Sequence, residues 1–250
     1  MTALRHTRLI FVRSIRPTLR SPSTLLFGVA QPVLYLALFG PLLADVGGPG
    51  GATSWQWFVP GLLVQLVLFT TAYAGFSLIP DQRSGAQERL RATPVSRLAL
   101  LLGRVLSNVV MLVAQAVLLV LPALAFGFRV PLAAALLGLL LLAALGVAIG
   151  AASYALATHL RNEYEFAPAL GSTVVPLMLL SGILLPMDAG PRWLYVVSRF
   201  NPLSHVVDAE RALTLGRYGA GAVMVGALVT AGLVVVCTAW GVRAFRRSPA

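Results

Sequence analysis

Six long apolar segments, separated by short polar connections, constrain this chain more than any other feature. The first, residues 21–44, contains no charged residue, and about 20 apolar residues are enough for an α-helix to cross the hydrocarbon core of a bilayer. A helix also satisfies its backbone hydrogen bonds internally, as a segment in lipid must. The sequence therefore predicts an all-α, polytopic membrane protein that forms one domain over residues 1–250. We expect its six transmembrane helices at residues 23–43, 58–79, 105–126, 132–157, 166–185 and 219–240.

Charged residues are scarce, and the basic ones are all of one type. They make up 11% of the chain against 58% hydrophobic residues, and all 19 basic side chains are arginines. Without lysine the chain cannot form the phosphate-binding loop GxxxxGK[ST], so any use of ATP would need a second chain. Cys237 is the single cysteine and the three histidines show no metal-ligand spacing. We therefore expect no catalytic residue, no metal site and no cofactor bound by this chain.

The distribution of the arginines predicts the orientation in the membrane. Six spans place both termini on one side, and 14 of the 19 arginines fall on that side. Loops rich in arginine stay in the cytoplasm, so both termini are expected there, and the net charge of +11 does not indicate nucleic-acid binding. Residues 1–20 predict an amphipathic interfacial helix that binds anionic lipid headgroups. The alternative is a basic tail that only fixes the topology.

Residues 181–216 carry arginines between two apolar segments and are expected outside the cell. An arginine at the bilayer centre costs at least roughly 2.5–3.5 kcal/mol, so this stretch cannot continue into lipid as its neighbours do. Within it, residues 188–217 predict an external re-entrant hairpin of two short helices. Trp193 lies on the apolar face of the first helix, while Asn201 caps the second and Pro202 takes its first position.

The charges of the second short helix are expected to compensate one another. Asp208 and Arg211 are three residues apart, the spacing of neighbours on one helix face. With Glu210 they would form a compensated cluster where the hairpin dips into the outer leaflet. The alternative is that all three are ordinary solvated charges.

Three stretches of the chain resemble a known family. They are LRSPSTLLFGVAQPVLYLALFGPLL, GAQERLRATPVSRLALLLGR and SGILLPMDAGPRWLYVVSRFNPLSHVVDAERAL. They are similar to the first span, the cytoplasmic connection and the external motif of the permease subunits of ABC-2 type exporters, in the daunorubicin-resistance-like group. The resemblance implies a subunit of the bacterial cell membrane that pairs with a second, identical permease. Two ATPase subunits would bind ATP and Mg, and the cargo would be a hydrophobic small molecule such as a drug, an antibiotic or a lipid.

In that family the cytoplasmic connection between the second and third spans, residues 80–98 here, includes the coupling helix that docks on the ATPase. The charged candidates for this contact are Glu88, Arg89 and Arg91, supported by Arg83 and Glu163 from the next cytoplasmic link. The alternative role of the arginines is to set topology and bind lipid headgroups.

Polar and aromatic side chains within the spans are candidates for the substrate pathway. They are Gln31, Phe69, Tyr73, Phe76, Met178 and Ser181. Packing between helices is the alternative explanation for them. Two other functions remain open. An ion-coupled secondary transporter would need a titratable membrane residue, and no carboxylate lies within a predicted span; a scaffold subunit would not transport by itself.

Overall fold

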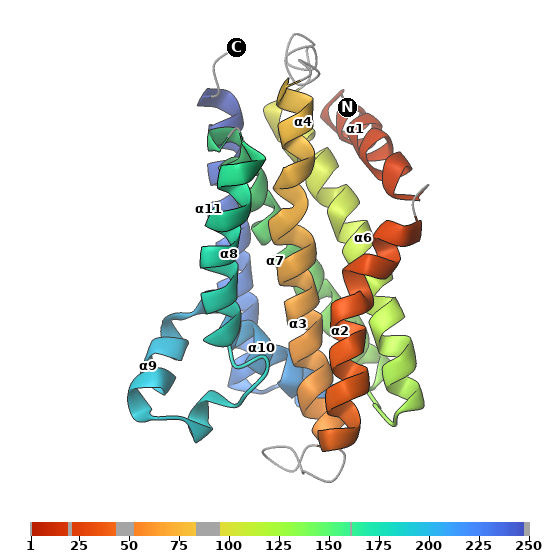
Figure 1. Ribbon diagram of the computed structural model, residues 1–250, viewed down its shortest axis with the longest axis vertical. Coiled ribbons are helices and arrows are strands. Elements are labelled where there is room, and N and C mark those ends of the chain that lie inside the picture. The colour runs from red at the N-terminus through yellow and green to blue at the C-terminus, as the bar shows by residue number, and fades with distance from the viewer. Residues whose placement is uncertain (1, 20–21, 44–52, 84–95, 161, 248–250) are drawn as a thin grey trace.

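The computed structural model describes residues 2–19, 22–43, 53–83, 96–160 and 162–247, and these ranges contain helices and no strand. The helices run roughly along one axis, and α1 lies at the same end of the bundle as the C-terminal end of α11 (Figure 1). The elements are α1 (Thr2–Leu19), α2 (Pro22–Leu43), α3 (Ser54–Ala72), η2 (Tyr73–Ser77), α4 (Leu78–Arg83), α6 (Arg97–Ala125), α7 (Leu132–His159), α8 (Glu163–Leu179), η3 (Met187–Ala189), α9 (Arg192–Phe200), α10 (Pro202–Thr214) and α11 (Gly221–Arg247).

Among the described residues, four helices are long and apolar enough to cross a membrane. They are Ser54–Asp81, Arg97–Ala125, Leu132–His159 and Gly221–Phe245, and a shorter apolar helix covers Leu25–Gly40. The predicted all-α class is therefore confirmed, and the chain is a multi-pass membrane protein. The two remaining expected spans correspond to α2 and to α8, which has 17 residues.

Two helix boundaries differ from the expected spans for local reasons. Helix α6 begins at Arg97, eight residues before the expected start, because the Ser96 hydroxyl accepts a hydrogen bond from the Ala99 N–H at 3.2 Å and caps the helix. Helix α8 ends at Leu179 rather than at residue 185. The chain turns there at Gly182, whose φ of +76° lies in the left-handed region that glycine adopts without strain.

A 3₁₀ segment, η2, interrupts the second long helix, and α7 compensates for the break. The Gly75 N–H donates to the Ser153 hydroxyl at 2.9 Å, and that hydroxyl donates to the Ala72 carbonyl. Backbone groups freed at such a break must find partners when the surroundings exclude water. Ser153 of α7 therefore locks the 3₁₀ turn against the centre of the bundle.

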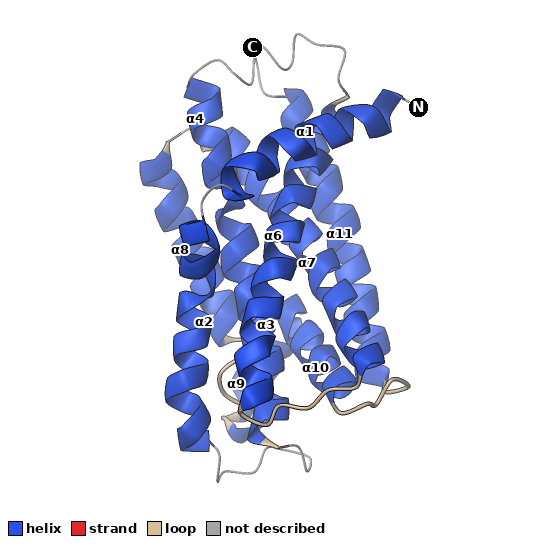
Figure 2. Cartoon of the chain, turned by 90° about the vertical axis from the view of Figure 1, so that its right-hand side faces the viewer, coloured by secondary structure: helices blue, strands red, loops and turns tan. Residues whose placement is uncertain are grey.

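Small residues let α7, α10 and α11 approach closely. A Cβ at Gly226 of α11 would lie 2.5 Å from the Cβ of Ala209 in α10, closer than two carbon atoms can come without repulsion. Helix α10 thus lies within the bundle against α7 and α11, at the end opposite α1 (Figure 2). Close approach at small residues is typical of helix pairs in membranes.

Helix α1 has the amphipathic character that the sequence predicts. Ile10 is buried against Gly103 of α6, where a Cβ would lie 2.6 Å from the Ile10 Cβ. Four arginines of α1 are exposed: Arg5, Arg8, Arg13 and Arg16. The helix therefore packs its apolar side on α6 and leaves its charges outside.

Candidate functional site

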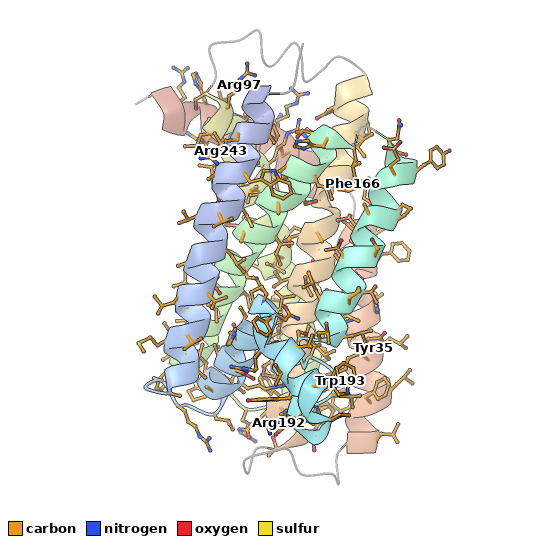
Figure 3. The ribbon with its side chains drawn as sticks, turned by 90° about the vertical axis from the view of Figure 1, so that its left-hand side faces the viewer. Tyr35, Arg97, Phe166, Arg192, Trp193 and Arg243 are labelled. Carbon is orange, nitrogen blue, oxygen red and sulfur yellow. The ribbon has the colours of Figure 1, made fainter. Side chains whose placement is uncertain are left out.

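Helices α9 and α10 form a hairpin at the end of the bundle opposite α1 and the C-terminal end of α11. Arg192 and Trp193 lie at this end, while Arg97 and Arg243 lie at the other (Figure 3). The structure divides the two helices at Asn201, with Pro202 as the first residue of α10, where the sequence places the division. Helix α9 is the exposed member, and 67% of the Trp193 side chain remains exposed.

Polar side chains at the hairpin bend bind the C-terminal end of α8. The Asn201 Oδ1 accepts a hydrogen bond from the Leu203 N–H at 3.0 Å, and its Nδ2 donates to the Leu177 carbonyl at 2.6 Å. The Ser204 hydroxyl lies 2.6 Å from the Ser198 carbonyl and 3.2 Å from the Leu180 carbonyl. The last carbonyls of a helix have no partner within it. Here the hairpin supplies donors for two carbonyls at this end of α8, which fixes the hairpin beneath α8.

The ion pair of the hairpin joins its two helices. Arg199 of α9 donates to Asp208 of α10 at 2.6 Å, and its other terminal nitrogen lies 3.0 Å from His205 Nδ1. The expected pairing of Asp208 with Arg211 is therefore wrong. Asp208 forms its ion pair across the hairpin because the bend at Asn201 brings α9 alongside the first turns of α10.

Arg211 instead binds main-chain carbonyls of two other segments. Its Nε donates to the Trp57 carbonyl at 3.1 Å, and its Nη2 donates to the Gly182 carbonyl at 2.8 Å. The guanidinium also lies 4.1 Å from the centre of the Trp57 ring, within the range of a cation–π interaction. Burial lowers the pKa of Arg211 to about 10, although the negative charges of Asp208 and Asp188 act in the opposite direction. Arg211 thus joins α10 to the start of α3 and to the turn after α8.

A polar cavity of about 320 Å³ lies between the hairpin, α3 and the turn after α8. Six of its lining residues are Trp57, Ser181, Tyr195, Arg199, Asp208 and Arg211. The cavity therefore brings together three residues singled out from the sequence, Ser181, Asp208 and Arg211. The buried Ser181 hydroxyl is already engaged, since it donates to the Met178 carbonyl at 2.6 Å.

Glu210 lies apart from this cluster, which corrects a second expectation. Its side chain is 3% exposed and points to α7, where the position of a Cβ on Gly138 would be 2.6 Å from Glu210 Oε2. Burial raises the pKa of Glu210 to about 8. The sequence contains a signal for this placement: Val206, Glu210 and Leu213 follow helical spacing on one face of α10, and both neighbours are apolar and buried.

The aromatic pathway candidates form a continuous row. The rings of Phe69 and Tyr73 are stacked with centroids 6.2 Å apart, and those of Tyr73 and Phe76 are stacked at 5.9 Å. Phe76 then meets Phe166 of α8 edge to face at 4.8 Å. The other three candidates lie outside this row. Gln31 is exposed on α2 and donates to the Tyr35 hydroxyl at 3.2 Å, Met178 is buried near the end of α8, and Ser181 lines the polar cavity.

The candidates for the ATPase contact are mostly outside the described residues. This holds for Glu88, Arg89, Arg91 and the side chain of Arg83, while Glu163 is exposed in the first turn of α8. The described flanks contain a partly buried ion pair that sequence reasoning missed. Arg104 of α6 donates to Asp81 of α4 at 2.5 Å, and 10% of the Arg104 side chain is exposed. This pair joins the two helices that border residues 84–95.

No group of three or more metal-ligating side chains occurs in the ranges that the structure describes. Residues 5–215 match the family model described as "ABC-2 type transporter". The chain is 28% identical to the daunorubicin resistance ABC transporter permease protein DrrB1 of Streptomyces coeruleorubidus, over 92% of this chain and 82% of that protein.

For two further relatives the match also includes most of the relative's length. One is the "Probable doxorubicin resistance ABC transporter permease protein DrrC" of Mycobacterium tuberculosis (strain ATCC 25618 / H37Rv), 24% identical over 86% of this chain and 78% of that protein. The other is nodulation protein J of Rhizobium leguminosarum bv. trifolii, 27% identical over 78% of this chain and 75% of that protein.

Proposed function

Because the chain belongs to the ABC-2 type transporter family, we propose that it is the permease subunit of an ATP-binding-cassette exporter. It moves a hydrophobic small molecule, drug-like or lipid-like, out across the bacterial cell membrane. The family match over residues 5–215 carries this proposal. Two of the relatives are ABC transporter permeases named for resistance to daunorubicin and doxorubicin, which supports a drug-like cargo.

The proposed topology has six spans with both termini in the cytoplasm. Helices α2 and α8 are the two spans that, with the four long apolar helices, make six. Helices α9 and α10 form a re-entrant cap on the external side. One observation supports it: Arg97 and Arg243 lie at the end of the bundle that also holds α1 and its exposed arginines (Figure 3). The exposed arginines of α1 would bind anionic headgroups at the cytoplasmic surface.

ATP hydrolysis is delegated to partner subunits. The chain has no lysine and hence no phosphate-binding loop of its own, and permeases of this family are not themselves enzymes. We assign to the complex two ATPase subunits, which bind ATP and Mg, and a second, identical permease. Residues 80–98 form the docking segment, with Glu88, Arg89 and Arg91 as its charged contacts and Arg83 and Glu163 in support.

The aromatic row is the proposed wall of the substrate pathway. Phe69, Tyr73 and Phe76 stack along the α3–η2 segment, and the row ends on Phe166 of α8. A row of flat aromatic rings offers a large contact area to a hydrophobic cargo and does not require the cargo to carry particular polar groups. The hairpin lies at the end where such a molecule would leave.

The test is ATPase activity and uptake by the purified permease–ATPase complex in proteoliposomes. We expect the permease alone to have no ATPase activity, and the complex to lose it on Glu88→Arg or Arg91→Glu. Arg129→Glu, an exposed arginine in the turn between α6 and α7, is the matched control and should leave activity unchanged. Transport by the permease alone without nucleotide would contradict the proposal, as would transport that collapses with a proton uncoupler at constant ATP.

A further inference from the structure

A second cavity, of about 170 Å³, lies between α6, α7 and α10. Its lining is apolar apart from Glu210 and Thr214, and the apolar part includes Val117, Leu121, Ala134 and Gly138. Val117 and Leu121 are 49% and 56% exposed. The cavity therefore reaches the apolar outer surface of the bundle, from which a molecule dissolved in lipid could enter.

The Glu210 carboxyl in this cavity has an unused hydrogen-bonding oxygen. Its Oε1 is buried without a hydrogen-bond partner among the described residues, and Glu210 takes part in neither of the two ion pairs found there. Thr214 cannot serve it, because its hydroxyl donates to the Glu210 backbone carbonyl at 2.8 Å. Gly138 makes the space for the carboxyl, since a side chain there would collide with it. A buried polar group without a partner is costly and rare in proteins.

The charged groups of neighbouring elements face elsewhere. Arg199, Asp208 and Arg211 line the polar cavity on the other side of α10. Helices α3, α6 and α7 contribute no titratable side chain to the described lining around Glu210. Helix α11 meets α10 through Gly226, at Ala209 and the His205 carbonyl. Arg129, in the turn between α6 and α7, lines a neighbouring cavity that shares Phe128, Val130 and Thr214 with this one, but neither of the two ion pairs in the described ranges involves it. Within the described part of the chain, no cation forms an ion pair with the Glu210 carboxylate.

The lining selects the chemistry of a ligand. Calcium takes six to eight oxygen ligands and magnesium a full octahedron, which one carboxyl among apolar groups does not offer. A purely apolar ligand would leave Oε1 unpartnered. An ammonium group has three donors, and a cavity of about 150 Å³ lined by apolar side chains is large enough for benzene. A small apolar body that carries an ammonium group satisfies both parts of the site.

We propose that this cavity binds an organic ammonium ion, with the ammonium donating to the Glu210 carboxylate and the apolar body filling the space between α6 and α7. Two sources share this chemistry: a free hydrophobic amine and the ammonium headgroup of phosphatidylethanolamine. The site belongs to the permease alone and does not depend on the ATP coupling proposed above.

Binding of the cation changes the protonation of Glu210. Burial raises the pKa of the Glu210 carboxyl to about 8, so the unliganded carboxyl is mostly neutral at pH 7. An ammonium ion favours the carboxylate, and the carboxyl proton is released to solvent as the ion pair forms. We expect release of close to one proton per amine at pH 6–7 and little release at pH 9, measured by calorimetry in buffers of different ionisation enthalpy.

The test measures binding of 2-phenylethylamine to the purified permease in a non-ionic maltoside detergent, without ATPase and without added lipid. We expect saturable binding, at least tenfold tighter than that of the neutral analogue 2-phenylethanol. Glu210→Gln keeps the shape and should weaken the amine at least tenfold while leaving the alcohol unchanged. Asp208→Asn, a carboxyl on the same helix that lines the other cavity, is the matched control and should change amine affinity less than twofold.

Two further variables make the outcome decisive. Ala134→Leu places a larger side chain in the cavity one turn from Gly138 and should weaken binding of the amine and the alcohol alike. This variant therefore distinguishes the effect of cavity volume from the effect of the Glu210 charge. Competition by phosphatidylethanolamine but not phosphatidylglycerol would identify a lipid headgroup as the source, and no competition by either would identify a free amine. Equal amine affinity in the wild type and in Glu210→Gln would overturn the proposal, provided that thermal unfolding curves show both proteins to be folded. So would the absence of saturable binding to the wild type.

Discussion

Arg211 is expected to be the side chain whose loss most destabilises the end of the bundle that holds the hairpin. Replacement by Met keeps much of the side-chain length and removes every polar contact. Three hydrogen bonds disappear, two short ones to the Trp57 carbonyl at 3.1 Å and the Gly182 carbonyl at 2.8 Å and a long one to the Ile183 carbonyl at 3.4 Å. The contact 4.1 Å above the Trp57 ring is lost as well. Hydrogen bonds to charged groups contribute about 1.5–3 kcal/mol each, and a desolvated cation–π contact about 2 kcal/mol.

Burial of the guanidinium offsets part of this gain. Desolvation lowers the pKa of Arg211 to about 10, which means that the charged form loses solvation on folding. The two short hydrogen bonds and the cation–π contact sum to about 5–8 kcal/mol before desolvation, and burying the guanidinium costs several kcal/mol. The net cost of Arg211→Met is therefore about 2–4 kcal/mol. For a chain of this length we expect a fall in the unfolding temperature of roughly 5–15 °C. Arg211→Lys should lose about half as much, because one ammonium cannot reach both carbonyls in the same geometry.

The assay is thermal unfolding in detergent, followed by tryptophan fluorescence, since Trp57 is itself a partner. Arg199→Met is the matched control. It breaks the ion pair with Asp208, whose two side chains are 38% and 41% exposed, and exposed pairs contribute only about 0.2–1 kcal/mol. If Arg211→Met and Arg199→Met lower the unfolding temperature equally, the carbonyl contacts do not have the weight assigned to them.

Two other predictions concern the remaining charges of α10. The raised pKa of Glu210 means that its contribution to stability is greatest below pH 4.5 and is lost as the pH rises towards 8. The stability advantage of Glu210→Gln over the wild type should therefore grow by about 2.5 kcal/mol between pH 6 and pH 9, and an advantage independent of pH would refute this assignment. Reversing Arg199 or Asp208 alone should lower the unfolding temperature more than the double reversal Arg199→Asp/Asp208→Arg, with a coupling energy of about 0.2–1 kcal/mol; a double mutant no better than the worse single mutant would show that the pair contributes nothing.

Local chemistry made much of the helix pattern predictable from the sequence. The division of the hairpin at Asn201 follows from a side chain that caps the next helix and a proline that fits its first position. The long apolar helices follow from composition and length alone. The end of α8 was not predictable in this way, because residues 180–185 are as apolar as the helix before them and only the turn at Gly182 separates them.

The partners of the charged side chains could not be predicted, because they depend on segments distant in the sequence. Helical spacing favours Arg211 as the neighbour of Asp208, yet the bend at Asn201 presents Arg199 instead. Arg211 reaches a carbonyl of α3, more than 150 residues away. Spacing within α10 does place Glu210 on the buried face, but the room for its carboxyl comes from Gly138 of α7. No pattern within α10 alone contains that information.

The hydrogen bonds between the hairpin and α8 impose an order on biogenesis. The carbonyls of Leu177 and Leu180 are satisfied by Asn201 and Ser204, each 24 residues later in the chain. During synthesis α8 must therefore leave the ribosome and wait with these two acceptors open until the hairpin follows. A chain released before residue 201 would keep them bare at the edge of an apolar helix, a defect that membrane proteases and chaperones can recognise. The two contacts that position the hairpin can thus form only after both α8 and the first turn of α10 have been synthesised.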